Sequence, residues 1–193
     1  MRLFVAIEAP SAWRDAASDA QRQLRAALPP ELAPSLRMVA PSTMHVTLRF
    51  IGEAGETLVP ALQAALDASV EPFEIYLTLG RVTSLGPDAR VSVVAIAVEG
   101  ERYALAELAA RLDGAVTSSL GVAPERRTFN PHLTLARMAR GLDAPDRRAV
   151  AAAARELAPP PELPFTARQF LLVRSHLAPE GSRYETLSHH RGR

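Results

Sequence analysis

Hydrophobic and polar residues follow two patterns along the chain: short apolar or alternating runs, and longer stretches in which apolar residues recur at helical spacing. Residues 2–8 form an apolar run that predicts a buried strand. An alanine-rich amphipathic stretch from Ser11 to Leu28 predicts a helix, with Ser11 as its N-cap. Residues 44–51 alternate and end at Gly52, which predicts a strand followed by a turn.

Strands and helices continue to alternate through the rest of the chain. The predicted helices cover residues 57–69, 101–119 and 144–157, and the predicted strands cover residues 73–82, 91–98, 132–138, 165–176 and 183–188. No Ser/Gly-rich linker divides the chain, so we expect residues 1–193 to form a single domain with an α/β (α+β) fold. The polar end, residues 189–193, is expected to be a solvated tail.

The composition excludes several classes of protein. The chain has 193 residues, a net charge of +1, 48% hydrophobic residues and no cysteine. It is therefore long and apolar enough to bury a core, and it is neither a disulfide scaffold nor a Cys-ligated zinc or iron–sulfur protein. All 22 basic residues are arginine, which a bias toward GC-rich codons explains. A charge near zero disfavours a broad nucleic-acid-binding surface.

The sequence contains no apolar run as long as the roughly 18–20 residues of a membrane span. The apolar segment at the N-terminus is too short for a secretory signal, and Glu8 follows it directly. We therefore expect a soluble cytoplasmic protein with no membrane attachment. A monomer without an obligate protein partner is the default expectation.

The candidate chemistry lies in two related tetrapeptides, His-Val-Thr-Leu at residues 45–48 and His-Leu-Thr-Leu at residues 132–135. In an extended strand, alternate side chains share a face, so the histidine and threonine of each copy point one way and the apolar residues the other. One such copy is ordinary on a half-buried strand. Two copies, each on a predicted strand followed by a helix and a strand, indicate an internal duplication and a paired site.

Two imidazoles and two hydroxyls suit the cleavage of a phosphodiester. Imidazole has an unperturbed pKa of about 6.5, so one ring can accept a proton while the other donates one. Threonine hydroxyls can donate hydrogen bonds to the non-bridging oxygens. In-line displacement at phosphorus needs these groups and, in principle, no metal ion.

The two motifs and their surroundings resemble those of the 2H phosphoesterase superfamily. Within it, the chain is similar to the bacterial and archaeal RNA 2′,3′-cyclic phosphodiesterases, historically called 2′-5′ RNA ligases. The likeness covers nearly the whole chain, and the segments that carry it are Leu3–Ile7, His45–Glu53, Arg127–Arg137, Arg174–Leu177 and Gly181–Tyr184.

This resemblance implies a bilobal fold in which two antiparallel sheets are related by a pseudo-two-fold axis, with helices outside and the histidines in the groove between. It implies hydrolysis of a 2′,3′-cyclic phosphate at an RNA end to a 2′-phosphate, without a cofactor or metal. His45 would protonate the departing 3′ oxygen and His132 would activate the water, while Thr47 and Thr134 would hold the phosphate. The reverse reaction would join such an end to a 5′-hydroxyl without ATP.

Several neighbouring residues have two interpretations. Strand alternation places Arg49 on the histidine face, where it would bind phosphate; the alternative is a surface arginine. Arg127, just before the second motif, is a weaker candidate for the same groove. Arg137 has the opposite parity to His132, which favours a structural or lobe-bridging role unless a bulge intervenes. Phe129 can stack a base, although an aromatic residue there is more typical of a core.

The remaining candidates belong to the C-terminal part of the chain. Ser175 and Tyr184 match the family's ending, and we expect them to pack and form a buried hydrogen bond. His176 has a weak case for any role. His189 and His190 are expected to belong to the solvated tail.

Three other functions compete with this interpretation. A metal-dependent hydrolase with His45 and His132 as ligands is disfavoured, because neither motif contains a second histidine or a carboxylate at ligand spacing. A non-catalytic protein that binds RNA ends is disfavoured by the two histidines, since binding alone is served equally well by arginine. A 2H phosphodiesterase acting on small cyclic nucleotides is the third alternative, and the physiological RNA stays open.

Overall fold

The computed structural model describes residues 1–178 and 181–191. The strands are β1 (Arg2–Glu8), β2 (Leu36–Met38), β3 (His45–Glu53), β4 (Ile75–Leu85), β5 (Val93–Gly100), β6 (His132–Met138), β7 (Phe165–Ala167), β8 (Phe170–Ala178) and β9 (Gly181–His190). The helices are α1 (Ser11–Ala27), α2 (Val59–Ala68), α3 (Arg102–Leu120) and α4 (Ala144–Glu156), with 3-10 turns at η1 (Ala33–Ser35), η2 (Pro41–Thr43), η3 (Glu56–Leu58) and η4 (Asp88–Arg90).

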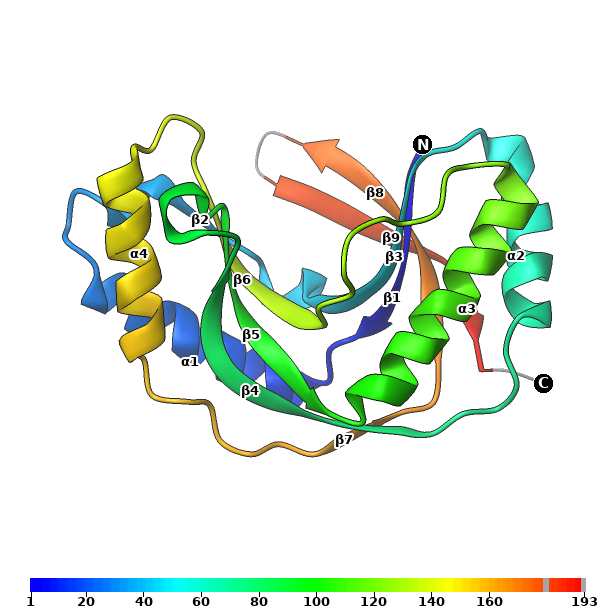
Figure 1. Ribbon diagram of the computed structural model, residues 1–193, viewed down its shortest axis with the longest axis horizontal. Helices are drawn as coiled ribbons and strands as arrows, with labels where there is room; N and C mark the ends of the chain where they lie inside the picture. Colours follow the sequence, from blue (N-terminus) through cyan, green and yellow to red (C-terminus); the bar gives the residue numbers. More distant parts are fainter. Residues whose placement is uncertain (179–180, 192–193) are drawn as a thin grey trace.

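Within the described residues, the strands form one curved, nine-stranded antiparallel sheet (Figure 1). Its order is β7-β4-β5-β6-β3-β1-β8-β9, with β2 paired to β6. β3 meets β6 at a single pair, Val46 and Leu133. This junction divides the sheet into a first half-sheet (β3, β1, β8, β9) and a second half-sheet (β6, β5, β4, β7). The two antiparallel sheets that the family resemblance implies are therefore the matched halves of one continuous sheet.

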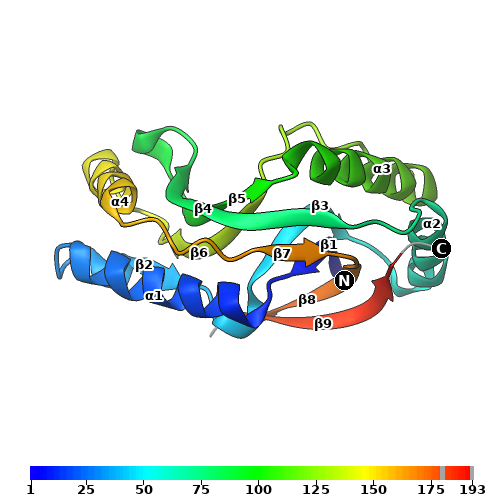
Figure 2. The same cartoon turned by 90° about the horizontal axis from the view of Figure 1, so that it is seen from below.

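The helices cover only the outer face of the sheet. α2 and α3 pack on each other, with α3 against β3 and α2 against β9. α1 contacts β6 and α4 contacts β4. Figures 1 and 2 accordingly show α2 and α3 at one end of the molecule and α1 and α4 at the other. We call the opposite side of the sheet its inner face. Among the described residues, no helix has the length and apolar character needed to span a membrane.

The main core lies between the outer face of the sheet and these helices. α1 contributes one apolar face at helical spacing, namely Trp13, Ala16, Ala17, Ala20 and Leu24. Each large side chain buried in this way contributes about 1.5–3 kcal/mol to folding. A second, smaller cluster lies on the inner face of the first half-sheet and consists of Phe4, Ala6, Leu171 and Val173, with Tyr184 packed against it.

The predicted helices and strands occur in the predicted order. The structure corrects the start of α1. Ser11 is the first residue of the helix, and Pro10 is the N-cap residue, in an extended conformation. No side-chain hydrogen bond caps this end. Proline fixes the backbone angle that precedes the helix, and its missing N–H is not needed there, so the helix begins without a hydroxyl cap.

The strand predicted for residues 165–176 is two strands. β7 pairs with β4 in the second half-sheet, whereas β8 pairs with β1 in the first. The chain therefore passes from one half-sheet to the other at Arg168 and Gln169, a change that a run of apolar residues does not reveal. β2 was not predicted because three residues are too few to form a recognisable alternation.

The expectation of a solvated tail is wrong for His189 and His190, which lie in β9. The side chain of His190 is only 1% exposed and stacks on Phe170. Its Nδ1 bonds to Asp67 at 2.8 Å and its Nε2 to Ser188 at 2.7 Å. Because both ring nitrogens have partners, this polar side chain can be buried. Residues 179–180, between the strands predicted for residues 165–176 and 183–188, and residues 192–193 lie outside the described residues.

Candidate active site

The two motifs lie on the adjacent strands β3 and β6. These strands pair at the residue between the histidine and threonine of each motif. Extending this antiparallel register by one position places His45 opposite Thr134 and Thr47 opposite His132. The structure therefore brings the four residues together on the inner face, at the junction of the half-sheets, which we call the His/Thr cluster.

Both histidines make the same hydrogen bond to their own chain. His45 Nδ1 lies 2.7 Å from the carbonyl oxygen of Thr43, and His132 Nδ1 lies 2.7 Å from that of Asn130. A carbonyl oxygen can only accept, so Nδ1 carries the proton in each ring. The neutral ring then has its lone pair on Nε2. Each motif thus fixes an imidazole whose remaining nitrogen can accept a proton.

The surroundings keep both rings neutral near pH 7. Burial lowers the pKa of His45 to about 4 and also lowers the pKa of His132. The hydrogen bonds at Nδ1 oppose this shift, and the positive charge of Arg137 adds to it in both rings. A charge on His132 lowers the pKa of His45 as well. The two rings therefore influence each other's protonation.

Aromatic side chains hold His45 on the inner face. Its ring stacks on Phe4, with centroids 4.7 Å apart, and meets the ring of Tyr184 edge-on at 5.2 Å. Phe4 and Tyr184 also contact each other edge-on at 5.1 Å. Tyr184 therefore packs as expected, and the ring it packs against is one of the two motif histidines.

Each motif strand contains a β-bulge at the same position. The pairing of β3 with β1 skips Leu48, and the pairing of β6 with β5 skips Leu135. Buried and exposed positions follow the same order over residues 45–51 and 132–138. A bulge adds one residue and reverses the alternation beyond it. The duplication therefore includes the irregularity of the strand as well as its motif.

The expectation that Arg49 shares a face with His45 is wrong, because the bulge at Leu48 lies between them. The Arg49 side chain is 8% exposed, and its Nε lies 2.5 Å from Asp113 Oδ1, an ion pair in which the N–H is poorly aligned for a hydrogen bond. The guanidinium also donates to the carbonyl oxygens of Phe50 and Ala123. Arg49 therefore faces α3 and the loop that follows it.

The same bulges turn Phe50 and Arg137 toward the inner face. Unbroken alternation would place Phe50 on the apolar face with Val46 and Leu48, but Phe50 is 45% exposed, and its ring lies 6.2 Å from that of Phe4. Arg137 is exposed and acts electrostatically on both histidines. The structural role expected of Arg137 assumed an unbroken strand, and the bulge at Leu135 removes that assumption. When the motifs are aligned, Ala136, a core residue, occupies the position of Arg49, so the position after the bulge is turned toward the core in both copies.

Arg127 lies beside Phe50 on the loop between α3 and β6. Its guanidinium carbon is 5.9 Å from the centre of the Phe50 ring. It donates from Nε and Nη2 to the two carboxylate oxygens of Glu125, at 3.1 and 2.8 Å. These hydrogen bonds lower the pKa of Glu125 to about 2. Phe129, on the same loop, packs against the core as expected.

The other C-terminal candidates lie on the hairpin of β8 and β9. His176 Nε2 is 2.8 Å from Glu185 Oε2, and Ser175 is the register partner of Tyr184. Within residues 1–178 and 181–191, no group of three or more His, Asp or Glu side chains is placed to hold a metal ion.

Alanines leave space above the two threonines. Ala6 on β1 is the register partner of Thr47, and Ala95 on β5 is the register partner of Thr134. A methyl group does not reach over a neighbouring hydroxyl, so each threonine can donate to a ligand on the inner face. The arrangement can therefore hold a small tetrahedral anion between two hydroxyls and two imidazoles, beside the positive charge of Arg137.

Comparisons with known proteins agree with this geometry. A family model described as the 2′-5′ RNA ligase superfamily matches residues 9–178. The RNA 2′,3′-cyclic phosphodiesterase of Thermus thermophilus is 32% identical over 202 residues, which cover 97% of this chain and 88% of that protein. The protein of the same name from Aeropyrum pernix is 32% identical over 111 residues, which cover 56% of this chain and 62% of that protein.

A solved structure matches the fold along its whole length. The crystal structure of the Thermus thermophilus protein TT0787 superimposes with a TM-score of 0.77 and 25% sequence identity, covering 100% of this chain and 99% of that chain. The family match spans most of the chain, and the structural match spans all of it. The chain therefore belongs to the 2′-5′ RNA ligase superfamily, the 2H phosphoesterases.

Proposed function

We propose that the protein hydrolyses 2′,3′-cyclic phosphate ends of RNA to 2′-phosphomonoesters by general acid–base catalysis. The observation that carries this proposal is the His/Thr cluster, in which two imidazoles with unprotonated Nε2 atoms lie beside two threonines. The names of the curated relatives, RNA 2′,3′-cyclic phosphodiesterase, support the choice of substrate.

In this mechanism, His132 accepts a proton from the attacking water through Nε2. The water oxygen bonds to phosphorus while the bond from phosphorus to the 3′ oxygen breaks. His45 donates a proton to that oxygen, which leaves a 3′-hydroxyl and a 2′-phosphate. Thr47 and Thr134 donate hydrogen bonds to the non-bridging oxygens, whose negative charge grows in the transition state. The two histidines then exchange protons with solvent.

The acid in this scheme has to gain its proton when the substrate binds. Burial lowers the pKa of His45 to about 4, so the ring is neutral at pH 7 before binding. A cyclic phosphate carries a negative charge, and an opposite charge at close range raises the pKa of an imidazole. The substrate thus promotes protonation of the group that acts on it. Arg137 supplies a second positive charge for the phosphate oxygens.

Ligation follows the same steps with a 5′-hydroxyl in place of water. The oxygen of that hydroxyl would bond to phosphorus as the 3′ oxygen departs, which forms a 2′-5′ linkage. In the opposite direction, cleavage of that linkage, the 5′ oxygen would depart and the roles of His45 and His132 would exchange. The cluster is equally compatible with small cyclic nucleotides. We further propose that the chain acts alone, as a monomer in the cytoplasm.

The test combines histidine variants with two substrates. RNA with a 2′,3′-cyclic end requires protonation of its leaving oxygen, whereas bis(p-nitrophenyl) phosphate releases a stable phenolate. His132→Ala should reduce turnover of both substrates by roughly 10²- to 10⁴-fold. His45→Ala should reduce RNA turnover by a similar factor but affect the aryl ester much less. His176→Ala is the control, because its ring is exposed and pairs with Glu185.

The outcomes separate the alternative functions. Binding of the RNA end without turnover would support the non-catalytic alternative. Loss of activity after EDTA, restored by Zn²⁺ or Mn²⁺, would contradict the metal-independent mechanism. Equal losses on both substrates in the two histidine variants would contradict the assignment of His45 as the acid. Detection of a 3′-phosphate product would overturn the stated regiochemistry.

A further inference from the structure

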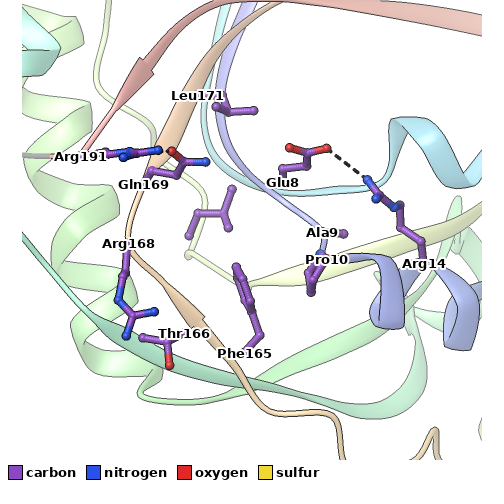
Figure 3. Close-up of a pocket in the computed structure, with 11 residues that line it drawn as sticks. Glu8, Ala9, Pro10, Arg14, Phe165, Thr166, Arg168, Gln169, Leu171 and Arg191 are labelled. Atoms are coloured by element: carbon purple, nitrogen blue, oxygen red, sulfur yellow. Dashed lines mark hydrogen bonds and ion pairs between the residues drawn. The ribbon is translucent and has the colours of Figure 1, made fainter.

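A cavity of about 510 Å³ lies beyond the His/Thr cluster, where β1 leads into α1 and β7 leads into β8 (Figure 3). We propose that this cavity binds the nucleotide preceding the cyclic end of the RNA strand. The inference rests on the proposed function and extends it from the reacting phosphate to the rest of the substrate.

The cavity is cationic. Arg14, Arg168 and Arg191 line it together with a single carboxylate, that of Glu8. Figure 3 shows Arg168 and Arg191 on one side of the cavity and the pair of Glu8 and Arg14 on the other. Glu8 balances the charge of Arg14, and Glu74, just outside the cavity, balances that of Arg168, so the net positive charge is that of Arg191. A positive charge among guanidinium donors suits a phosphodiester.

Each of these arginines has donors beyond its known contacts. Arg14 uses Nη1 to contact Glu8 at 3.1 Å, and Arg191 uses Nε to contact Gln169 at 3.1 Å. Arg168 uses Nε and Nη2 to contact Glu74. A guanidinium has further N–H groups, so these pairs orient the side chains and leave donors for a phosphate.

An apolar surface accompanies these charges. The remaining contacts come mainly from nonpolar side chains, namely Ile7, Ala9, Pro10, Phe165 and Leu171. An inorganic anion needs only charge, whereas a nucleotide presents a phosphate together with a flat base and a ribose. The combination of arginines with an aromatic and aliphatic surface therefore favours a nucleotide.

The cavity adjoins the candidate active site through Glu8 and Leu171, two of the residues that line it. Leu171 belongs to the inner-face cluster that contains Phe4, on which the His45 ring stacks. Glu8, on the cavity wall, is the register partner of His45. The cavity therefore begins on the neighbouring strand beside the proposed general acid. An RNA whose cyclic phosphate lies in the His/Thr cluster can extend into it with its adjacent nucleotide.

The experiment measures a preference for substrate length. The substrates are uridine 2′,3′-cyclic phosphate and the dinucleotide UpU carrying the same cyclic end. In the unmodified protein, kcat/KM for the dinucleotide should exceed that for the mononucleotide by roughly 10-fold or more, the effect of hydrogen bonds to a charged group. The double variant Arg168→Gln, Arg191→Gln should bring this ratio close to one, mainly through KM.

The matched control is Arg155→Gln. Arg155 is a comparably exposed arginine, and it pairs with Asp88 rather than lining the cavity. It should leave the length preference intact. Arg14 is not varied because its loss would free the carboxylate of Glu8 beside His45. Thermal unfolding of each variant checks that the fold is retained, and the single variant Arg191→Gln repeats the test if the double variant unfolds.

Each result decides a specific point. Equal kcat/KM for the two substrates in the unmodified protein would overturn this inference, as would a length preference that survives in the double variant. In both cases the mononucleotide is still hydrolysed, so the proposed function stands. Failure to hydrolyse either substrate would contradict the proposed function, and this inference with it. If added inorganic phosphate removes the length preference of the unmodified protein but does not change the ratio of kcat/KM in the variants, the cavity is supported as the phosphate site.

Discussion

At the scale of single residues, the candidate site buries two imidazoles that, in the proposed mechanism, also exchange protons. The carbonyl oxygens of Thr43 and Asn130 fix the two rings through Nδ1. Burial then disfavours the charged form, most strongly at His45. Such a site costs the protein stability under acidic conditions, because the folded chain resists a proton that the unfolded chain accepts.

The first prediction concerns this pH dependence. The pKa of His45 is about 4 in the folded protein, against an ordinary value of 6.5. Above pH 6.5 the ring is neutral in both the folded and the unfolded chain, so it does not reduce the free energy of unfolding. As the pH falls from 6.5 toward 4, the unfolded chain binds a proton that the folded chain does not, and the free energy of unfolding decreases. The loss is at most roughly 3 kcal/mol. His45→Gln removes the titrating group. Between pH 7 and pH 4.5, the free energy of unfolding of this variant should therefore fall less than that of the unmodified protein.

Urea unfolding at the two pH values measures this difference. His176→Gln is the matched control, since it also removes an imidazole, but an exposed one that contacts Glu185 rather than Phe4 and Tyr184. If His45→Gln and the unmodified protein lost the same stability between these pH values, the lowered pKa of His45 would be wrong.

At the scale of elements, one buried arginine connects the first motif strand to α3 and to the loop that precedes the second motif strand. Arg49 of β3 contacts Asp113 of α3 and donates to the carbonyl oxygen of Ala123. Asp113 also accepts the backbone N–H of Glu125. The loop held in this way continues to Asn130, whose carbonyl oxygen orients His132. Arg49 therefore links the first motif strand to the loop before the second, and we expect it to help position His132 through that loop.

The second prediction is that Arg49→Gln destabilises the protein by about 3–5 kcal/mol, because it leaves the partly buried carboxylate of Asp113 without its partner. Turnover should fall as well, although Arg49 does not face the His/Thr cluster. Urea unfolding and kcat measure the two effects. Arg102→Gln breaks an exposed pair with Glu99 and should cost about 0–1 kcal/mol.

The double variant Arg49→Met, Asp113→Leu provides the decisive comparison. Replacing both partners leaves neither charge of the pair unpaired. The double variant should therefore lose less free energy of unfolding than the sum of the losses in the single variants Arg49→Met and Asp113→Leu. Additive losses would mean that Arg49 and Asp113 do not depend on each other.

At the scale of the whole molecule, neither half-sheet is built from a continuous part of the chain. β1 belongs to the first half-sheet, but the helix that follows it, α1, covers the second. β7 belongs to the second half-sheet and β8, which follows it, to the first. Because these connections cross the junction, we expect residues 1–193 to unfold as one unit.

The third prediction is that probes in the two half-sheets report the same unfolding midpoint. Trp13, the single tryptophan, is buried beside the second half-sheet and donates to the carbonyl oxygen of Leu163. The chain has no cysteine, so Leu58→Cys, at an exposed position before α2, accepts a unique fluorescent label. Separate midpoints for the tryptophan and the label would show two domains.

Much of this architecture is predictable from local patterns. Hydrophobic periodicity located the long helices and the motif strands, because each buries one face against the core. The bulges at Leu48 and Leu135 are not predictable in this way, since a strict period of two assumes an unbroken ladder. The burial of His190 is not predictable either, because its partner Asp67 is distant in sequence. The roles expected of Arg49 and Arg137 were therefore interchanged: the first faces the core and the second the site.

The two copies of the duplicated site differ chemically just beyond their matched bulges. With the motifs aligned position by position, the counterpart of Phe50 on the inner face is Arg137, so one copy presents an aromatic ring where the other presents a cation. The backbone is nearly symmetric, but the two walls are chemically different. A nucleotide bound with its base toward Phe50 and its phosphate toward Arg137 has no equivalent when rotated by half a turn. We therefore expect the two orientations to differ in energy, and this difference to give unlike tasks to the two histidines although their motifs match.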